Sequence, residues 1–291
     1  MPNHLKKRKG FDLTFSKEKN LKINWFPGHM KKALDEMRAE LNKADAVVYV
    51  LDSRAPKSCL NPELSRLTNG KPILYILNKI DLTDFARLES IKSTFKGDGF
   101  DYLMLNSTQS GSAKDVCTKI RSLCSAKVKK FESKGIGVTL RAIIVGVPNC
   151  GKSTLVNNLC KKAKAVTGDR PGVTKGKQWF KIGTGVEICD TPGTLYPNLS
   201  NQEIAKTLAF IGSIRDEILD EVEVATELLA RIEKLYPSAI ETRFKGAKNL
   251  EGICRVRAYL LSGGELDISR AAKAVISEFR SGKLGKLMIE E

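Results

Sequence analysis

Blocks of apolar residues, separated by amphipathic stretches, run through the first two thirds of the chain. Five continuous apolar runs have the composition of buried parallel strands, at residues 46–51, 72–77, 102–105, 141–145 and 186–189. Residues 178–182 alternate between polar and apolar positions and lead through Gly-Thr-Gly at 183–185 into the last run, which predicts an antiparallel edge. Helical spacing separates most strands and begins with residues 30–43. The pattern predicts an α/β fold with a six-stranded, mainly parallel sheet covered by helices on both faces.

The pattern changes near residue 200. Helical periodicity then dominates over 202–233 and again over 269–280, with breaks at Gly263-Gly264 and Gly282. We therefore expect three parts, which are a flexible basic arm at 1–20, an α/β domain at 21–199 and a small all-α domain at 200–291.

Several targeting routes are disfavoured. No apolar run reaches the roughly 18 residues of a membrane span, so no membrane contact is expected. Residues 1–20 lack the apolar segment of a secretory signal, and their Lys-over-Arg bias with Asp12 and Glu18 argues against a mitochondrial transit peptide. Seven cysteines without a C-x-x-C pair disfavour a disulfide framework or a structural zinc site and fit a reducing cytoplasm.

Net charge points to a polyanionic partner. The chain has 49 Lys plus Arg against 33 Asp plus Glu, a formal charge of +16, and nucleic acid is the expected partner. Basic residues concentrate in 1–34 and 161–181, whereas 203–233 is acidic. The alternative is that the two basic clusters are solvated faces that keep the protein in solution.

The first chemical motif is Gly146-Val-Pro-Asn-Cys-Gly-Lys-Ser153, a match to G-x-x-x-x-G-K-[ST]. It follows a predicted strand and opens a predicted helix, which is the context that a phosphate-binding loop requires. Backbone N–H groups can surround the phosphates, Lys152 can neutralise the β- and γ-phosphates, and the Ser153 hydroxyl can bind Mg²⁺. The helix N-terminus adds a dipole that favours anions.

Asp190-Thr-Pro-Gly193 comes at the end of the strand that follows the phosphate loop. Asp190 is suited to Mg²⁺, and the Gly193 N–H to the γ-phosphate. Between this tetrad and the phosphate loop, Thr174 lies where a switch segment could close over the metal.

Asn78-Lys-Ile-Asp81 lies at another strand end. The Asp81 carboxylate can accept from guanine N1–H and the exocyclic amine, donors that adenine does not present there, so an ATP-dependent kinase is disfavoured. Asn78 can tie this loop to the phosphate loop, Lys79 can cover the base with its stem, and Asn106-Ser107 can offer backbone N–H to the base oxygen.

All parts of a GTP/GDP site are thus present, yet Asn78-Lys-Ile-Asp81 precedes the phosphate loop instead of following it. One cyclic shift restores the usual order, and close chain termini make such a permutation compatible with the same sheet. The sequence therefore predicts a P-loop GTPase fold with a circularly permuted G domain. The expected nucleotide contacts are Asn78, Lys79, Asp81, Asn106, Ser107, Asn149, Cys150, Gly151, Lys152, Ser153, Thr154 and Gly193.

The motif order, together with Trp25-Phe-Pro-Gly-His-Met30 and Gly168-Asp-Arg-Pro-Gly-Val-Thr174, resembles the bacterial ribosome biogenesis GTPase A (YlqF) family over residues 21–291. The resemblance implies a cytoplasmic GTPase that binds the precursor of the large ribosomal subunit and its ribosomal RNA late in assembly. Asn149 occupies a phosphate-loop position that resembles the Asn of potassium-dependent GTPases, so its side-chain oxygen could help hold K⁺, whereas the alternative is an Asn that only forms the turn. We expect a monomer whose GTP hydrolysis is slow in the isolated protein and is stimulated by ribosomal particles.

Two departures bear on mechanism. The arm at 1–20 extends beyond the usual start of the family. Position 194 is Thr, where relatives carry an aliphatic residue and Ras-like proteins a water-orienting Gln. His29, one of two histidines, is the candidate for that missing group beside Lys152 and Gly193, although it could instead cap a helix beginning near Met30.

Alternatives from other classes stay open. The chain could be a GTPase acting on another RNA such as tRNA, or a nucleotide-gated binding module with negligible turnover. Cys150 stands just before a helix N-terminus, where it is either a reactive thiolate or an inert small side chain.

Overall fold

The structure is a computed structural model that describes residues 37–68, 70–164, 179–183, 185–191, 193 and 201–290, with 161–164 as backbone only. The strands are β1 (Ala46–Asp52), β2 (Ile73–Asn78), β3 (Phe100–Leu105), β4 (Leu140–Val145), β5 (Trp179–Gly183) and β6 (Val186–Asp190). The helices before residue 200 are α2 (Pro62–Leu67), η1 (Ile80–Leu82), α3 (Phe85–Ile91), η2 (Lys92–Phe95), α4 (Ala113–Leu123), α5 (Ser125–Glu132) and α6 (Lys152–Lys164). Those after it are α7 (Gln202–Phe210), η3 (Asp216–Ile218), α8 (Glu221–Leu235), α9 (Ala239–Arg243), α10 (Leu250–Arg257) and α11 (Ile268–Arg280).

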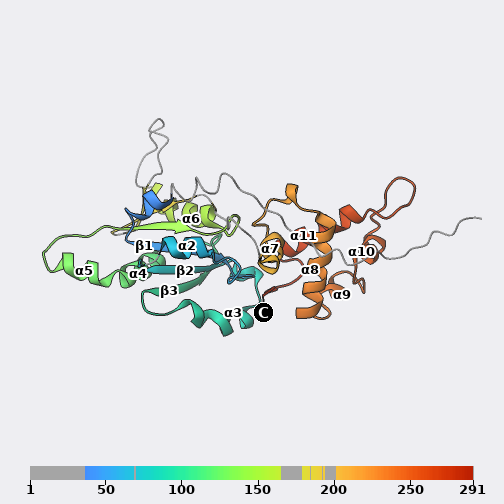
Figure 1. Ribbon diagram of the computed structural model, residues 1–291, viewed down its shortest axis with the longest axis horizontal. Coiled ribbons are helices and arrows are strands. Elements are labelled where there is room, and N and C mark those ends of the chain that lie inside the picture. Colours follow the sequence, from blue (N-terminus) through green and yellow to red (C-terminus); the bar gives the residue numbers. More distant parts are fainter. Residues whose placement is uncertain are drawn as a thin grey trace, which may run out of the picture.

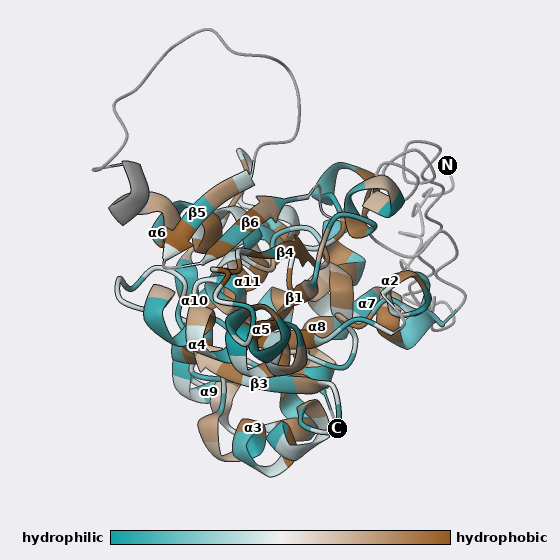
Figure 2. Cartoon of the chain, turned by 90° about the vertical axis from the view of Figure 1, so that its left-hand side faces the viewer, coloured by the Kyte–Doolittle hydropathy of each residue, from teal (hydrophilic) through white to brown (hydrophobic). Residues whose placement is uncertain are grey.

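The sheet has six strands in the order β3-β2-β1-β4-β6-β5, all parallel except β5, which runs antiparallel to β6. This confirms the predicted sheet, including its antiparallel edge. The central strands β1 and β4 are the most apolar, and apart from Arg141 all their residues are buried. Figure 2 shows these strands among helices that mix hydrophobic and hydrophilic residues, as a sheet covered on both faces requires.

The order in which successive strands are added to the sheet reverses between β1 and β4. Successive strands β1, β2 and β3 step toward one edge, whereas β4, β6 and β5 occupy the other side. Ligands of open α/β sheets bind at such a switch point, beyond the carboxyl ends of the strands. The loops that follow β1, β2, β3, β4 and β6 all begin at this edge of the sheet.

Among the described residues beyond 201, the chain forms helices and no named strand. These helices lie together to one side of the sheet (Figure 1). The helical stretch expected over 202–233 is two helices, α7 and α8. Gly212, at a φ of +78°, ends the first, and Asp220 caps the second by accepting from Val222 N and Glu223 N. The boundary near residue 200 stays a prediction, since 194–200 lie outside the described residues.

The two parts share one continuous hydrophobic cluster, which includes Leu51 of β1 and Phe279 of α11. The last described residues, 284–290, return to the α/β part as a strap. Ile289 N donates to Arg54 O at 2.9 Å, and Leu287 N donates to Leu82 O at 3.2 Å. The helical part is therefore docked against the edge where the strands end.

Candidate functional site

The loop between β4 and α6 depends on two glycines. Gly146 has a φ of +148° and Gly151 a φ of +102°. A Cβ at Gly146 would lie 2.4 Å from Val50 O, and one at Gly151 would lie 2.2 Å from Asn78 Nδ2. Only glycine fits these positions, which explains in physical terms why the motif carries glycine there.

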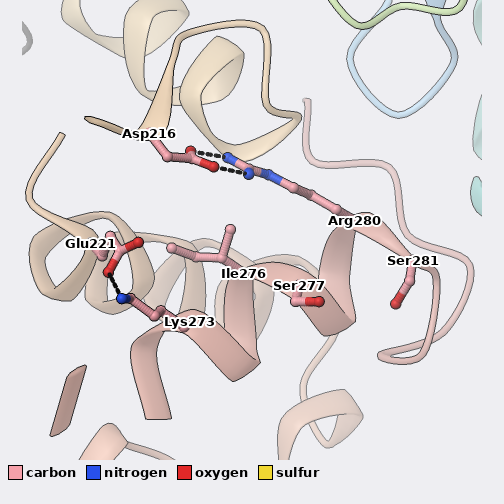
Figure 3. Close-up of a pocket in the computed structure, with 7 residues that line it drawn as sticks. All are labelled: Asp216, Glu221, Lys273, Ile276, Ser277, Arg280 and Ser281. Atoms are coloured by element: carbon pink, nitrogen blue, oxygen red, sulfur yellow. Dashed lines mark hydrogen bonds and ion pairs between the residues drawn. The ribbon is translucent and has the colours of Figure 1, made fainter. Parts of the chain in front are cut away.

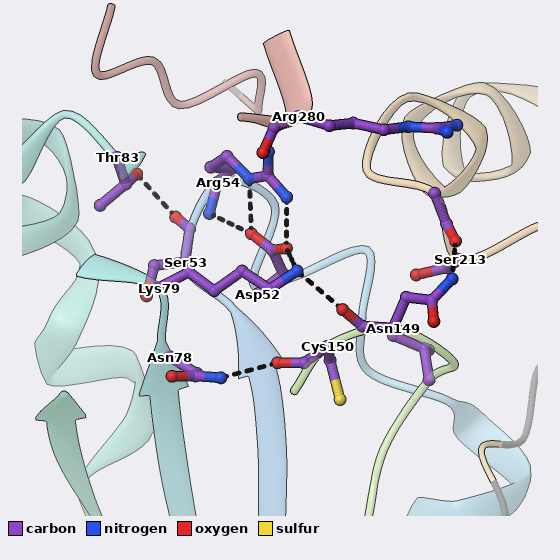
Figure 4. A network of polar contacts seen from close by, with 12 residues as sticks. Asp52, Ser53, Arg54, Asn78, Lys79, Thr83, Asn149, Cys150, Ser213 and Arg280 are labelled. Atoms are coloured by element: carbon purple, nitrogen blue, oxygen red, sulfur yellow. Dashed lines mark hydrogen bonds and ion pairs between the residues drawn. The ribbon is translucent and has the colours of Figure 1, made fainter. Parts of the chain in front are cut away.

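Asn78 joins three loops at the end of the sheet. Its Nδ2 donates to Cys150 O at 2.8 Å (Figure 4), and its Oδ1 accepts from Ser107 N at 2.9 Å. The loops after β2, β3 and β4 are thereby held at fixed separations. The Ser107 N–H, one of the groups expected to meet the base oxygen, donates to Asn78 and shapes this loop, and its contact with the base stays a prediction.

Lys79 extends along the phosphate loop. It adopts a left-handed conformation with a φ of +62°, and its Nζ donates to Asn149 O at 2.7 Å. Asp81 follows in η1 with an exposed side chain. The Asn106 side chain accepts from Thr108 N at 2.9 Å, which closes a local turn after β3.

Lys152 and Gly193 lie next to each other. Lys152 is buried, and its Nζ donates to Val147 O at 2.8 Å. A Cβ at position 193 would lie 2.7 Å from Pro148 Cα and 3.0 Å from Lys152 Nζ. The tetrad after β6 is therefore packed against the phosphate loop, with no room for a side chain at Gly193.

Ser153 and Asp190 form a pair suited to a divalent cation. Ser153 Oγ donates to Asp190 Oδ2 at 3.2 Å. Asp190 Oδ1 is buried without a hydrogen-bond partner among the described residues. A hard cation that prefers oxygen ligands and keeps several waters fits this donor set. Thr154 is exposed in the first turn of α6.

Cys150 behaves differently from a reactive thiol. It is fully buried, and burial raises the pKa of its thiol despite the nearby charges of Lys152 and Lys79. Both observations argue against a reactive thiolate and favour the alternative of an inert small side chain. Burial of the group removes the water that a thiolate needs.

Two polar residues that the sequence analysis missed lie directly behind the site. Asp52 and Arg54 are fully buried at the end of β1 and form a two-pronged ion pair, with distances of 2.7 and 2.9 Å. Burial by itself would raise the pKa of Asp52, but the charges and hydrogen bonds of Arg54 and Lys79 outweigh it and hold that pKa well below its ordinary value. The available signal was an Asp-x-Arg triplet directly after a buried strand.

Some expected site residues cannot be placed. His29, Thr174, the arm at 1–20 and the basic cluster at 1–34 lie outside the described residues, as does most of 161–181. All seven cysteines are buried, and none of them forms a disulfide. In the part of the chain that the structure describes, no group of three or more His, Cys, Asp or Glu could hold a metal, and no helix is long and apolar enough to cross a membrane.

The sheet order, the glycine loop after β4 and the Asn-Lys-x-Asp loop after β2 define a P-loop GTPase with a circularly permuted G domain. Residues 141–243 match the family described as 50S ribosome-binding GTPase. The match begins at β4, so residues 78–81 precede it, as the permuted order requires.

The chain belongs to the ribosome biogenesis GTPase A family. It is 38% identical to the ribosome biogenesis GTPase A of Bacillus cereus over 92% of this chain and 93% of the relative. The Thermotoga maritima protein of that name is 33% identical, over 92% of this chain and 94% of the relative. The GNP-bound structure of YlqF from T. maritima is similar with a TM-score of 0.66 and 28% identity, covering 89% of this chain and 98% of that one.

Proposed function

We propose that this chain is a guanine-nucleotide switch that hydrolyses GTP and acts late in assembly of the large ribosomal subunit, whose precursor and ribosomal RNA it binds. The observation that carries the proposal is the Asn78 hub. One side chain joins the guanine-reading loop, the phosphate loop and the loop after β3. These hydrogen bonds fix the relative positions of the three loops, which a nucleotide that contacts all three requires.

The proposed roles follow from position. Asp81 accepts from the guanine edge, the stem of Lys79 covers the base, and the N–H groups from Asn149 to Thr154 surround the phosphates. Lys152 and the Gly193 N–H stabilise charge that develops on the γ-phosphate. Mg²⁺, which this class of GTPase uses, would supply charge neutralisation between the phosphates, held by Ser153, Asp190 and Thr174.

Two further groups complete the proposal. The Asn149 side chain directs its Nδ2 to Gly212 O, which leaves the amide oxygen as the atom able to bind K⁺.

His29 is proposed to orient the attacking water once a ribosomal particle is bound. His29→Ala should then keep GTP affinity and particle binding but abolish most of the stimulated turnover. Stimulation at the wild-type level in this variant would remove His29 from the mechanism.

The setting is proposed as the cytoplasm, where free cysteines such as these seven persist. All nucleotide-binding motifs come from one chain, so a monomer suffices. The test is co-sedimentation of the protein with ribosomal particles in GDP and in a non-hydrolysable GTP analogue. Selective binding to large-subunit particles with the analogue is expected. Binding to tRNA in preference to these particles would favour the alternative RNA substrate.

A further inference from the structure

Asn149 of the phosphate loop is held from two sides. Its backbone oxygen accepts from Lys79 Nζ at 2.7 Å, and its side-chain Nδ2 donates to Gly212 O in the helical part at 2.6 Å (Figure 4). Its φ of +59° is left-handed, a backbone conformation that Asn tolerates better than most residues with a side chain. A residue in this conformation persists when its surroundings hold it.

The first hold leads from Lys79 into the helical part. Asp52 Oδ2 lies 2.9 Å from Lys79 Nζ and also binds Arg54. The remaining donor of Arg54, Nη1, reaches the carboxyl end of α11, at 3.2 Å from Arg280 O and 3.4 Å from Phe279 O. A cation is favoured there because the last carbonyls of a helix have no partner within it.

The second hold leads from Gly212 to the same residue of α11. The turn after α7 also contacts the phosphate loop through Ser213 Oγ, which donates to Pro148 O at 2.9 Å. The Arg280 guanidinium fixes this turn. It donates to Ala209 O at 2.8 Å and Phe210 O at 3.1 Å, and it binds both carboxylate oxygens of Asp216, as Figure 3 shows for the ion pair.

The contacts therefore close a circuit that begins and ends at Asn149 and passes through Arg280. The backbone oxygen of Arg280 accepts a hydrogen bond from Arg54. The Arg280 guanidinium supports the turn in which Gly212 O accepts a hydrogen bond from Asn149. Two fork-shaped ion pairs give the circuit a fixed geometry, because a guanidinium binds a carboxylate in one plane.

We propose that Arg280 is a positioning residue for the phosphate loop, through which docking of the helical part sets the affinity for guanine nucleotide. The proposal rests on the function proposed above and adds the route by which that site is regulated. Whatever shifts α11 relative to the sheet, such as a particle bound to the helical part, changes the support of Asn149 and so the nucleotide affinity. The reverse holds by linkage.

The test is a double-mutant cycle on GDP affinity, measured by fluorescence titration with a labelled nucleotide. Arg280→Ala should weaken GDP binding by about 5- to 20-fold, which is the lower part of the range typical of coupling between sites. Asn149→Gly removes the side-chain amide that donates to Gly212 O, and glycine tolerates the left-handed backbone at this position. In that background Arg280→Ala should change affinity by less than about twofold, because its effect travels through Asn149. The matched control is Arg270→Ala on the same helix. The Arg270 side chain lies over the Tyr259 ring, away from this circuit, so the variant should bind GDP like the wild type.

An equal loss in both backgrounds would overturn the proposal, since Arg280 would then only stabilise the fold. An unchanged affinity in Arg280→Ala would overturn it as well. Should that variant fail to fold, Asp216→Ala removes the carboxylate that binds the Arg280 guanidinium and enters the same cycle. It should lose affinity only when Asn149 is present, and any other result contradicts the circuit. A wild-type protein that bound no guanine nucleotide would remove the proposed function itself, an outcome distinct from these.

Discussion

At the scale of single residues, the loops of the site are held together by polar side chains that are buried and hydrogen-bonded. Asn78 uses both atoms of its amide on other loops, and Asp52 is bound by two cations. Such groups cost free energy when one partner is lost, because the other remains buried without a partner. Small changes in these side chains should therefore have large effects.

The first prediction concerns nucleotide choice. Asp81→Asn removes the acceptor for guanine N1–H and the exocyclic amine, and it should weaken GTP binding by about 1–3 kcal/mol. Affinity for xanthosine nucleotide, which carries an oxygen there, should rise. Titration with both nucleotides measures this, and unchanged GTP affinity would remove residues 78–81 from guanine recognition.

The second prediction concerns pH. The folded-state pKa of Asp52 lies below its unfolded value, so the stability that it contributes is present above the unfolded pKa of about 3.9 and is lost as pH falls below it. Asp52→Asn should cost about 3–5 kcal/mol at pH 7, because Arg54 stays buried. The difference between the two proteins should shrink from pH 5 toward pH 3 in urea unfolding. A constant difference across that range would contradict the ionised pair.

At the scale of elements, the hydropathy pattern was sufficient for the sheet and its edge. Buried parallel strands read as apolar runs, and each expected run overlaps an observed strand. The pattern failed at residues 202–233, since the apolar spacing continues across a turn that Gly212 and Arg280 fix through contacts distant in sequence. It also missed Asp52 and Arg54, which bind each other and connect Lys79 to the backbone oxygens of Phe279 and Arg280. Long-range polar contacts leave no periodic signal.

The third prediction tests that turn. Gly212 and Gly264 have φ values of +78° and +84°, so alanine strains the backbone equally at both. A Cβ at Gly264 meets nothing within 4 Å, whereas one at Gly212 lies 3.1 Å from Arg280 Nε. Gly212→Ala should therefore lose about 1 kcal/mol more in urea unfolding than Gly264→Ala. Equal losses would show that Arg280 does not pack tightly against this turn.

At the scale of the whole molecule, a basic protein brings a helical part against the edge of the sheet where the nucleotide motifs gather. The strap at 284–290 reinforces this arrangement, with Arg87 Nη1 donating to Met288 O at 3.3 Å and Arg231 Nη1 to Ile289 O at 3.1 Å. A switch with this architecture can report its nucleotide state to a large RNA-containing particle.

The fourth prediction concerns that particle. Charge reversal at Lys161, Lys162 and Lys164 should weaken association with large-subunit particles and flatten its salt dependence, because phosphate contacts release counterions. Affinity for GDP should stay unchanged. Sedimentation at two or more salt concentrations measures the effect, and undiminished particle binding would leave these lysines as a solvated face.

The most direct test of the central claim is GTP turnover by the purified protein with Mg²⁺ and K⁺, alone, with large ribosomal subunits and with small ones. Without a Gln beside Gly193, turnover alone should be slow, and large subunits should increase it while small subunits should not. Turnover that is the same in all three conditions would contradict the proposal that this chain is a GTPase switch triggered by the large ribosomal subunit.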